Sequence, residues 1–231
     1  MGQLTFLVTD TKSNIKEDPR VVIKELSKTC NECRLSYLHP DNRGLILRGN
    51  PDGNVAVIGE APGDTETERG QPLVGVSGRE WDKWARFINL DQNRCLLTNV
   101  VQCQPGKQRV DGRLSQKPPD KDEIKACFGS RTLRVLTAMP NLEVVITLGW
   151  VAAKTILGGE PKGNTHEGRW FTTSILPNIA VFCMVHPAYL LREPSPEKTG
   201  RVEQNLLLFK REYLDSNKIL DLMKEISETN G

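Results

Sequence analysis

The sequence lacks the features that mark membrane, secreted and disulfide-rich proteins. No apolar run in its 231 residues approaches the roughly 18 that a membrane-spanning helix needs. The N-terminal stretch has neither the basic start nor the long apolar core of a secretory signal. Six cysteines are too few for a disulfide scaffold in a chain of this length. These absences favour a cytoplasmic, monomeric globular protein, with one domain over residues 1–231 and no membrane partner.

A strong net charge is also missing. The chain has 31 basic and 29 acidic residues, a net charge of +2, which by itself does not identify a nucleic-acid-binding protein. Between residues 101 and 134, however, the chain has eight Lys or Arg residues and only four acidic residues. Such a local excess could contact phosphates, whereas a solvated loop and helix surface would explain the same charges without any partner.

Four short apolar runs are typical of strands: Val55–Ile58, Cys95–Leu97, Val144–Leu148 and Ile179–Val185. Most lack alternation between apolar and polar residues, as expected for strands buried on both faces of a parallel sheet. Helical patterns lie between and after them, over Ser77–Ile88 with Ser77 as N-cap, Asp120–Thr137, Trp150–Leu157 and Glu197–Leu214. The alternation predicts an α/β fold, a three-layer α/β/α sandwich around a mainly parallel four-stranded sheet.

Two segments fall outside this pattern. Residues 105–119 are rich in Gly, Pro, Lys and Gln without apolar periodicity, which predicts a long, exposed basic loop. Residues 215–231 form a C-terminal tail with an apolar helical stripe, which we expect to pack back on the domain.

The most informative segment is Val55–Gly78, where an apolar strand ends abruptly in Gly59-Glu60-Ala61-Pro62-Gly63. A strand that stops in such a turn places backbone N–H groups and a carboxylate at the carboxyl edge of a sheet. Open α/β folds bind their ligands at that edge. The segment therefore predicts a site loop.

This segment also resembles the first motif of the family 4 uracil-DNA glycosylases, through GEAPG and the later Gly-x-Pro-Leu-Val-Gly-x-Ser-Gly. Two further motifs of that family follow in order, Thr98–Cys103 and His186-Pro187-Ala188 with Leu191-Arg192. The resemblance covers about Cys30 to Arg211. It implies the sandwich fold and a DNA glycosylase that leaves an abasic site.

Four cysteines form a second pattern: Cys30 and Cys33 in a CxxC, then Cys103 and Cys127. The spacing itself fits a tetrahedral zinc site or an iron–sulfur cluster, and the CxxC alone fits a redox pair. The resemblance implies a [4Fe-4S] cluster on these four residues, with zinc as the alternative. Cys95 and Cys183 lie in apolar runs and are expected in the core.

Base excision puts negative charge on the departing base and positive charge on the sugar. Their positions at strand ends favour His186 as the hydrogen-bond donor to the base and Asn99 as the amide that reads it. Glu60 is the first candidate for positioning water or stabilising sugar charge, ahead of Asp64 and Glu66. Ala61 stands where related families place an aspartate, so Glu60 or backbone groups would have to activate water. His39 and His166 are expected to be structural, and no lysine for Schiff-base chemistry stands beside these motifs.

The resemblance also implies DNA contacts by the loop after His186, which in similar enzymes wedges into the duplex. Leu190 or Leu191 would be the wedge and Arg192 would contact a phosphate, although core packing is an equal alternative for each leucine. The basic loop adds Lys107 and Arg109 as DNA contacts.

Leu73 departs from the family pattern, which has a phenylalanine that stacks on uracil. The pocket then suits either a weaker uracil glycosylase or one that excises a bulky hypermodified cytosine from phage DNA in antiviral defence. A binding module that lost turnover is the competing class of function, and a redox protein that uses Cys30 and Cys33 is another.

Overall fold

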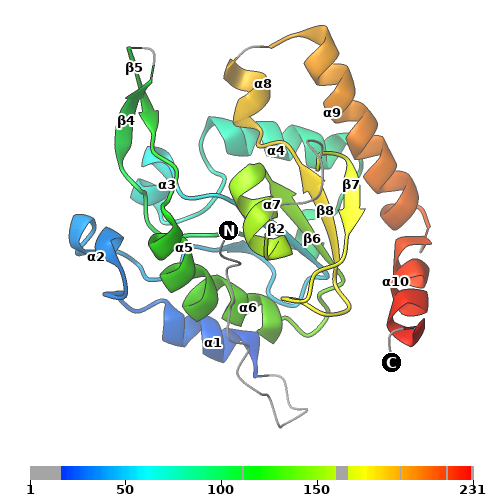
Figure 1. Cartoon of the computed structure of the whole chain (residues 1–231), viewed down its shortest axis with the longest axis horizontal. Helices are drawn as coiled ribbons and strands as arrows, with labels where there is room; N and C mark the ends of the chain where they lie inside the picture. Colours follow the sequence, from blue (N-terminus) through cyan, green and yellow to red (C-terminus); the bar gives the residue numbers. More distant parts are fainter. Residues whose placement is uncertain (1–16, 111, 160–165, 193, 217, 230–231) are drawn as a thin grey trace.

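The computed structural model describes residues 17–110, 112–159, 166–192, 194–216 and 218–229. Six strands form one sheet in the order β1-β3-β2-β6-β8-β7, and two more form a separate hairpin, β4–β5 (Figure 1). The sheet strands are β1 (Arg48–Gly49), β2 (Val55–Gly59), β3 (Cys95–Asn99), β6 (Val144–Leu148), β7 (Arg169–Phe171) and β8 (Ala180–Met184). The four central strands are parallel, while β1 and β7 pair antiparallel at the two edges.

The central strands are fully buried because each feeds two cores. In β2, Ala56 and Ile58 join one cluster while Val55 and Val57 join the other. Successive strand residues point to opposite faces, so a strand covered on both faces must be apolar throughout. This explains why the runs showed no alternation.

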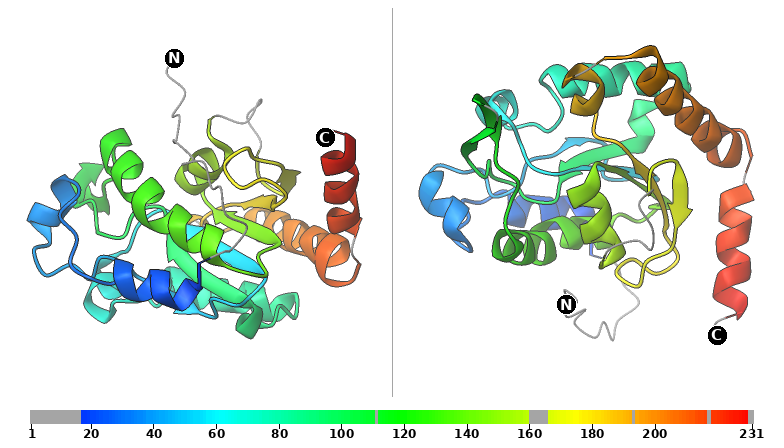
Figure 2. Two further views of the ribbon diagram at one scale, coloured as in Figure 1. Left: turned by 90° about the horizontal axis from the view of Figure 1, so that it is seen from below. Right: turned by 45° about the horizontal axis from the view of Figure 1, so that its top comes forward.

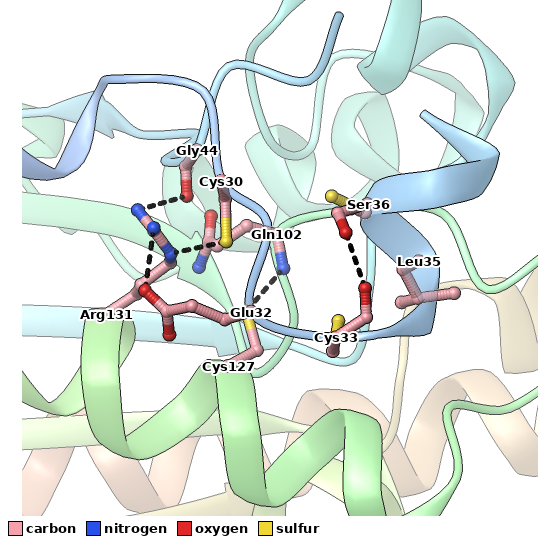
Figure 3. Close-up of a pocket in the computed structure, with 10 residues that line it drawn as sticks. Cys30, Glu32, Cys33, Leu35, Ser36, Gly44, Gln102, Cys127 and Arg131 are labelled. Carbon is pink, nitrogen blue, oxygen red and sulfur yellow. Dashed lines mark hydrogen bonds and ion pairs between the residues drawn. The ribbon is translucent and has the colours of Figure 1, made fainter. Parts of the chain in front are cut away.

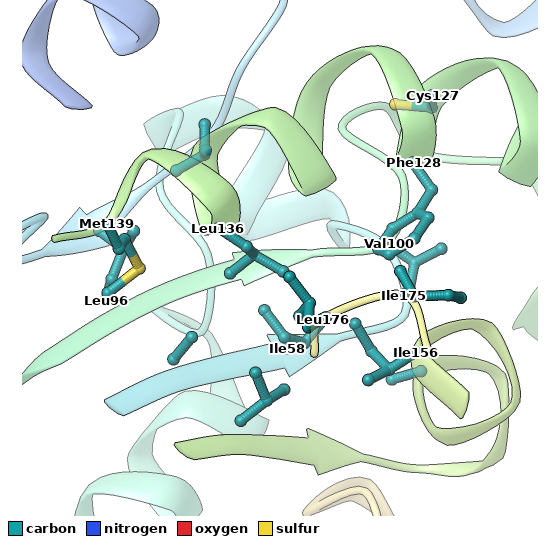
Figure 4. Packing of buried hydrophobic residues seen from close by; sticks show 14 of the residues in the cluster. Ile58, Leu96, Val100, Cys127, Phe128, Leu136, Met139, Ile156, Ile175 and Leu176 are labelled. Carbon is teal, nitrogen blue, oxygen red and sulfur yellow. The ribbon is translucent and has the colours of Figure 1, made fainter. Parts of the chain in front are cut away.

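Helices cover both faces of the sheet (Figures 1 and 2). The first core cluster, part of which Figure 4 shows, is built mainly with α1 (Pro19–Leu26), α2 (Arg34–Leu38), α5 (Lys121–Cys127), α6 (Leu133–Ala138) and α7 (Trp150–Leu157). The second uses α4 (Val76–Phe87), α8 (Ala188–Arg192), α9 (Pro196–Phe209) and α10 (Lys218–Thr229). The remaining helical segments are α3 (Asp64–Arg69), the 3-10 helix η1 (Gln92–Arg94), and the π-helical segments η2 (Phe128–Thr132) and η3 (Lys210–Leu214).

The three-layer sandwich and its parallel centre are confirmed, and the differences lie at the margins. The edge strands were missed because β1 has two residues and β7 three, too short for a periodicity. Helix α4 begins at Val76 with Gly75 as N-cap, so Ser77 is not the cap. The segment after His186, which the sequence predicts as a tight loop, forms the short helix α8.

The expected basic loop is a β-hairpin, with β4 (Lys107–Val110) paired to β5 (Arg113–Gln116). It projects from the side of the molecule opposite α10 (Figure 1). The hairpin lacks an apolar face to pack on a core, so hydrophobic patterning did not reveal it.

The tail beyond Asp215 is helical and is anchored by Ile219, which is buried in the second cluster. Residues 1–16 and 230–231, part of the expected domain, lie outside the described residues. Among the helices of the described ranges, none combines the length and apolar character that crossing a bilayer requires.

Candidate functional site

One cavity of about 500 Å³ lies at the carboxyl edge of the parallel strands. Six residues that the sequence singled out line it together: Glu60, Ala61, Leu73, Asn99, His186 and Arg192. They come from four separate chain segments, and three of them follow or end the strands β2, β3 and β8. This placement follows the rule that ligands of open α/β sheets bind at the strand ends.

Asn99 is the last residue of β3 and is only 3% exposed. Its backbone carbonyl accepts hydrogen bonds from Gln102 Nε2 at 2.9 Å and from Thr132 Oγ1 at 2.8 Å, which fix its position. A Cβ on Gly59 would lie 2.5 Å from Asn99 Oδ1, so only glycine leaves space for this amide. Asn99 Nδ2 is buried without a hydrogen-bond partner in the described structure. A buried donor without a partner is costly, and a ligand acceptor in the cavity would relieve that cost.

His186 stands two residues beyond β8. Burial is the main reason that its pKa falls to about 4, and the nearby positive charge of Arg192 lowers it further. The imidazole is therefore neutral at pH 7. Its Nδ1 accepts the backbone N–H of Ala188 at 3.2 Å, which leaves the proton on Nε2. His186 thus presents a neutral Nε2–H donor.

Glu60 directly follows β2 and is partly buried. Burial raises the pKa of its carboxyl group, and the charge of Arg192 partly opposes that effect. Ala61 beside it supplies no carboxylate. Glu60 is therefore the carboxylate that the first turn of the site loop contributes to the cavity lining.

Leu73 is 5% exposed and has a left-handed backbone, with φ of +52°. Three contacts hold this strained loop. Arg48 Nη1 donates to the carbonyl of Leu73 at 2.9 Å, and Glu66 Oε1 accepts from the N–H groups of Val74 at 3.1 Å and Gly75 at 2.7 Å. Glu66 therefore shapes the pocket wall through backbone contacts, and Leu73 lines the pocket as expected.

Of the residues expected to contact DNA, the structure buries one and leaves others exposed. Leu190 is 7% exposed and belongs to the second core cluster, which favours the core-packing alternative for this leucine over the wedge. Leu191 is 41% exposed and keeps that possibility. Arg109 is exposed on the hairpin. Lys107 is paired with Asp64, with 2.8 Å between Nζ and Oδ2.

The cavity also contains Glu66, which the sequence offers as a candidate after Glu60. Five further lining residues were not assigned to the site: Ser77, Gln116, Trp150, Tyr189 and Lys198. Lys198 contradicts the expectation that no lysine stands beside the motifs. Its Nζ lies over the Tyr189 ring, 4.8 Å from the centroid. Trp150 could have been found from its position directly after an apolar strand, whereas Gln116 and Lys198 reach the site only through tertiary structure.

The four cysteines line a second cavity together with Arg131 and Gln102 (Figure 3). Arg131 Nε donates to Cys30 Sγ at 3.2 Å, and the backbone N–H of Gln102 donates to Cys127 Sγ at 3.3 Å. Burial raises the pKa of Cys103 to about 11 and that of Cys127 to about 12.

The described side chains around this second cavity are not arranged as a site for a single metal ion. Within the described ranges, no three His, Cys, Asp or Glu side chains are grouped closely enough to bind one metal ion. Cys95 and Cys183 are core residues, 1% and 0% exposed, as predicted.

Comparisons with known proteins agree with this geometry. A family model described as the uracil DNA glycosylase superfamily matches residues 47–207. The type-4 uracil-DNA glycosylase of Pyrobaculum aerophilum is 27% identical over 199 residues, which cover 81% of this chain and 91% of that protein. Those of Saccharolobus solfataricus and Thermotoga maritima are 29% and 27% identical, covering 77% and 79% of this chain and 79% and 88% of their own. Because the family model spans well over half of the sequence, the chain belongs to the uracil DNA glycosylase superfamily.

Proposed function

We propose that the protein is a DNA glycosylase that hydrolyses the N-glycosidic bond of uracil in DNA and leaves an abasic site. One observation carries the proposal: the carboxylate of Glu60, the amide of Asn99 and the imidazole of His186 line a single cavity, in which Asn99 Nδ2 has no partner within the described structure. An extruded uracil offers the acceptors and the N–H donor that a fixed carboxamide can read.

The neutral Nε2–H of His186 suits the leaving base. As the bond between C1′ and N1 breaks, the electron pair moves to the uracil ring, and negative charge develops on its oxygens. A fixed donor at that point is worth more in the transition state than in the ground state. Because His186 has a low pKa, it stabilises this charge as a hydrogen-bond donor without first becoming a cation.

Glu60 serves the sugar side of the reaction. Its ionised carboxylate stabilises the oxocarbenium-like sugar and orients the water whose oxygen bonds to C1′. Since burial raises its pKa, the ionised fraction grows with pH, and the rate should fall on the acidic side.

The product is an unbroken strand with an abasic site. Lys198 is the lysine of the cavity lining, and its ammonium lies over the ring of Tyr189. This cation–π contact gives the lysine a packing role, and the proposed hydrolysis uses no amine nucleophile. The DNA strand would follow Arg192 and Leu191 on α8 and the basic hairpin with Lys107 and Arg109.

We assign a [4Fe-4S] cluster to Cys30, Cys33, Cys103 and Cys127. The donor set fits, because four thiols line one cavity and two N–H groups already point at sulfur atoms. A cluster gives each thiolate its own iron, so the sulfurs need not surround one point as they would for zinc. When bound, the cluster supplies structural cross-links between the N-terminal segment, the end of β3 and α5.

The test is release of free uracil from single- and double-stranded oligonucleotides, with separate assays for strand cleavage. We expect release by the wild type, and a loss of about 100- to 1,000-fold in His186→Ala, as for removal of one oxyanion donor. Asn99→Ala should also lose rate and should lose discrimination against cytosine. Asn141→Ala is the matched control, because that amide lies far from the cavity lining and bonds Asp52.

Two outcomes would contradict the proposal. Failure to release uracil, or release of modified pyrimidines alone, would replace the substrate. Strand cleavage that disappears in Lys198→Met would replace the hydrolytic reaction with lyase chemistry.

A further inference from the structure

We infer that Trp150 is a stacking platform for a nucleobase of the substrate strand next to the target nucleotide. The inference rests on the proposed function and adds a binding position to the same site.

Trp150 stands in the middle of the catalytic edge. It opens α7 after the single residue Gly149 that follows β6, and β6 lies between β2 and β8 in the sheet. The preceding Gly149 has φ of +90°, and a Cβ there would lie 3.1 Å from Cβ of His186. The backbone that leads into Trp150 therefore passes against the catalytic histidine, and the indole lines the same cavity.

The Trp150 ring is the more open of the two aromatic rings in the described cavity lining, because a single cation, Lys154 Nζ, lies over it, at 5.9 Å from its centroid. Its side chain is 41% exposed. Tyr189 is the other Trp, Tyr or Phe in the described lining, but Lys198 and Arg201 lie over its ring, 4.8 Å and 5.5 Å from the centroid, and Arg201 bonds its hydroxyl at 2.6 Å. Trp150 is tilted against His166, with centroids 4.9 Å apart, which orients the indole.

The depth of the surrounding residues assigns the occupant. Asn99 and Leu73, at 3% and 5% exposure, form the floor that receives the target base, while Trp150 forms the rim. Extruding one nucleotide removes the stacking partner of its neighbours. An exposed indole can replace that partner for any base, since every base has a π-face.

The experiment couples the side chain to individual bases. Binding is measured to a strand with a 2′-fluorinated deoxyuridine at the target position, whose fluorine suppresses the cationic sugar, and to strands lacking the 5′ or the 3′ neighbouring base. We expect Trp150→Leu to weaken binding about tenfold on the intact strand, and Trp150→Phe to bind nearly normally. Removing the stacked neighbour should cost wild type about the same factor and cost Trp150→Leu almost nothing more.

The control is Phe87→Ala, which removes an aromatic side chain of 47% exposure at the far end of α4 from the cavity residue Ser77. It should bind every strand like wild type. If losses from Trp150→Leu and from each base deletion simply multiply, or if Trp150→Leu binds normally, the inference is wrong. Uracil release by the wild type is scored separately, so that result would leave the proposed function standing.

Discussion

Two cavities of the molecule are built in different ways: the excision cavity, lined by Glu60, Asn99 and His186, and the cysteine cavity, lined by the four cysteines. The first uses residues at the ends of parallel strands, which the sheet places along one edge. The second joins the loop after α1, the segment after β3 and helix α5, with no shared sheet register. Strand ends are held by backbone pairing, whereas the cysteine segments depend on side-chain contacts such as those of Arg131.

This difference suggests that the two regions respond oppositely to mutation. Loss of a group in the excision cavity should impair chemistry and leave the fold intact, because the sheet does not depend on it. Loss of a group in the cysteine cavity should impair structure first. Three measurements sharpen or break this comparison.

Removal of a cluster ligand should have the largest effect. For Cys127→Ala we expect loss of the absorbance near 400 nm that cysteine-ligated iron gives. We also expect a drop in the free energy of unfolding on the order of 5 kcal/mol, because metal binding contributes to folding. Denaturant unfolding and limited proteolysis between α1 and β1 measure the structural part.

Cys183→Ala is the matched control, because Cys183 is also buried but lies in the core of β8. It should keep its colour and lose about 1 kcal/mol from a small cavity. A Cys127→Ala protein that stays brown, or that unfolds like the control, would contradict the cluster assignment.

The free energy of unfolding should depend on pH because of one residue of the excision cavity, His186. His186 has a pKa of about 4 in the folded protein and about 6.5 when unfolded. The folded state binds fewer protons, so stability is complete above pH 6.5 and declines as the pH falls towards 4, by about 3 kcal/mol.

His186→Asn should remove that part of the decline, which urea unfolding between pH 4 and 7 will measure. Asn99→Ala, which alters the same cavity without deleting a titrating group, should retain the wild-type slope. If the free energy of unfolding changes with pH in the same way for wild type and His186→Asn, burial does not lower the pKa of His186 and the prediction is wrong.

The smallest effect should come from the contact that links the site loop to the hairpin. Asp64 accepts hydrogen bonds from Gln104 Nε2 and Lys107 Nζ, both at 2.8 Å, and these lower its pKa. The pair is largely exposed, so Asp64→Asn should cost less than about 1 kcal/mol of stability. DNA binding should weaken about twofold to fivefold, and amide exchange in β4 and β5 should accelerate.

Asp122→Asn offers a matched charge deletion, because Asp122 lies on the exposed surface of α5 and lines neither cavity. If both variants bind DNA equally, Asp64 contributes only charge, and the hairpin is held by its other contacts.

The sequence sufficed for the sheet and for the strand-end residues, and the reason is physical. Fully buried strands such as β2 must be apolar throughout, and their ends must meet at one edge, so Glu60 and His186 could be placed together before any coordinates. Lys198 reaches the same cavity from α9, and Gln116 from the hairpin. Their positions depend on packing between distant elements, which no local pattern encodes.

Leu190 and Leu191 illustrate the same limit. They are adjacent, equally apolar and in one short helix, yet one is 7% exposed and the other 41%. Which of the two faces the core is decided by the angle at which α8 meets α4 and α9, and that angle is absent from the sequence pattern.

The hairpin has its two ends side by side, with the N–H of Lys117 bonded to the carbonyl of Gly106 at 3.0 Å. An insertion that starts and finishes at one point imposes no displacement on the elements that flank it. Ribbons of other lengths and charges could therefore be grafted between Lys107 and Gln116, so that Gln116 stays in the cavity lining and the strand-end residues are unchanged. The DNA contact that we propose for the hairpin and the chemistry at the strand ends could then be varied separately within one chain.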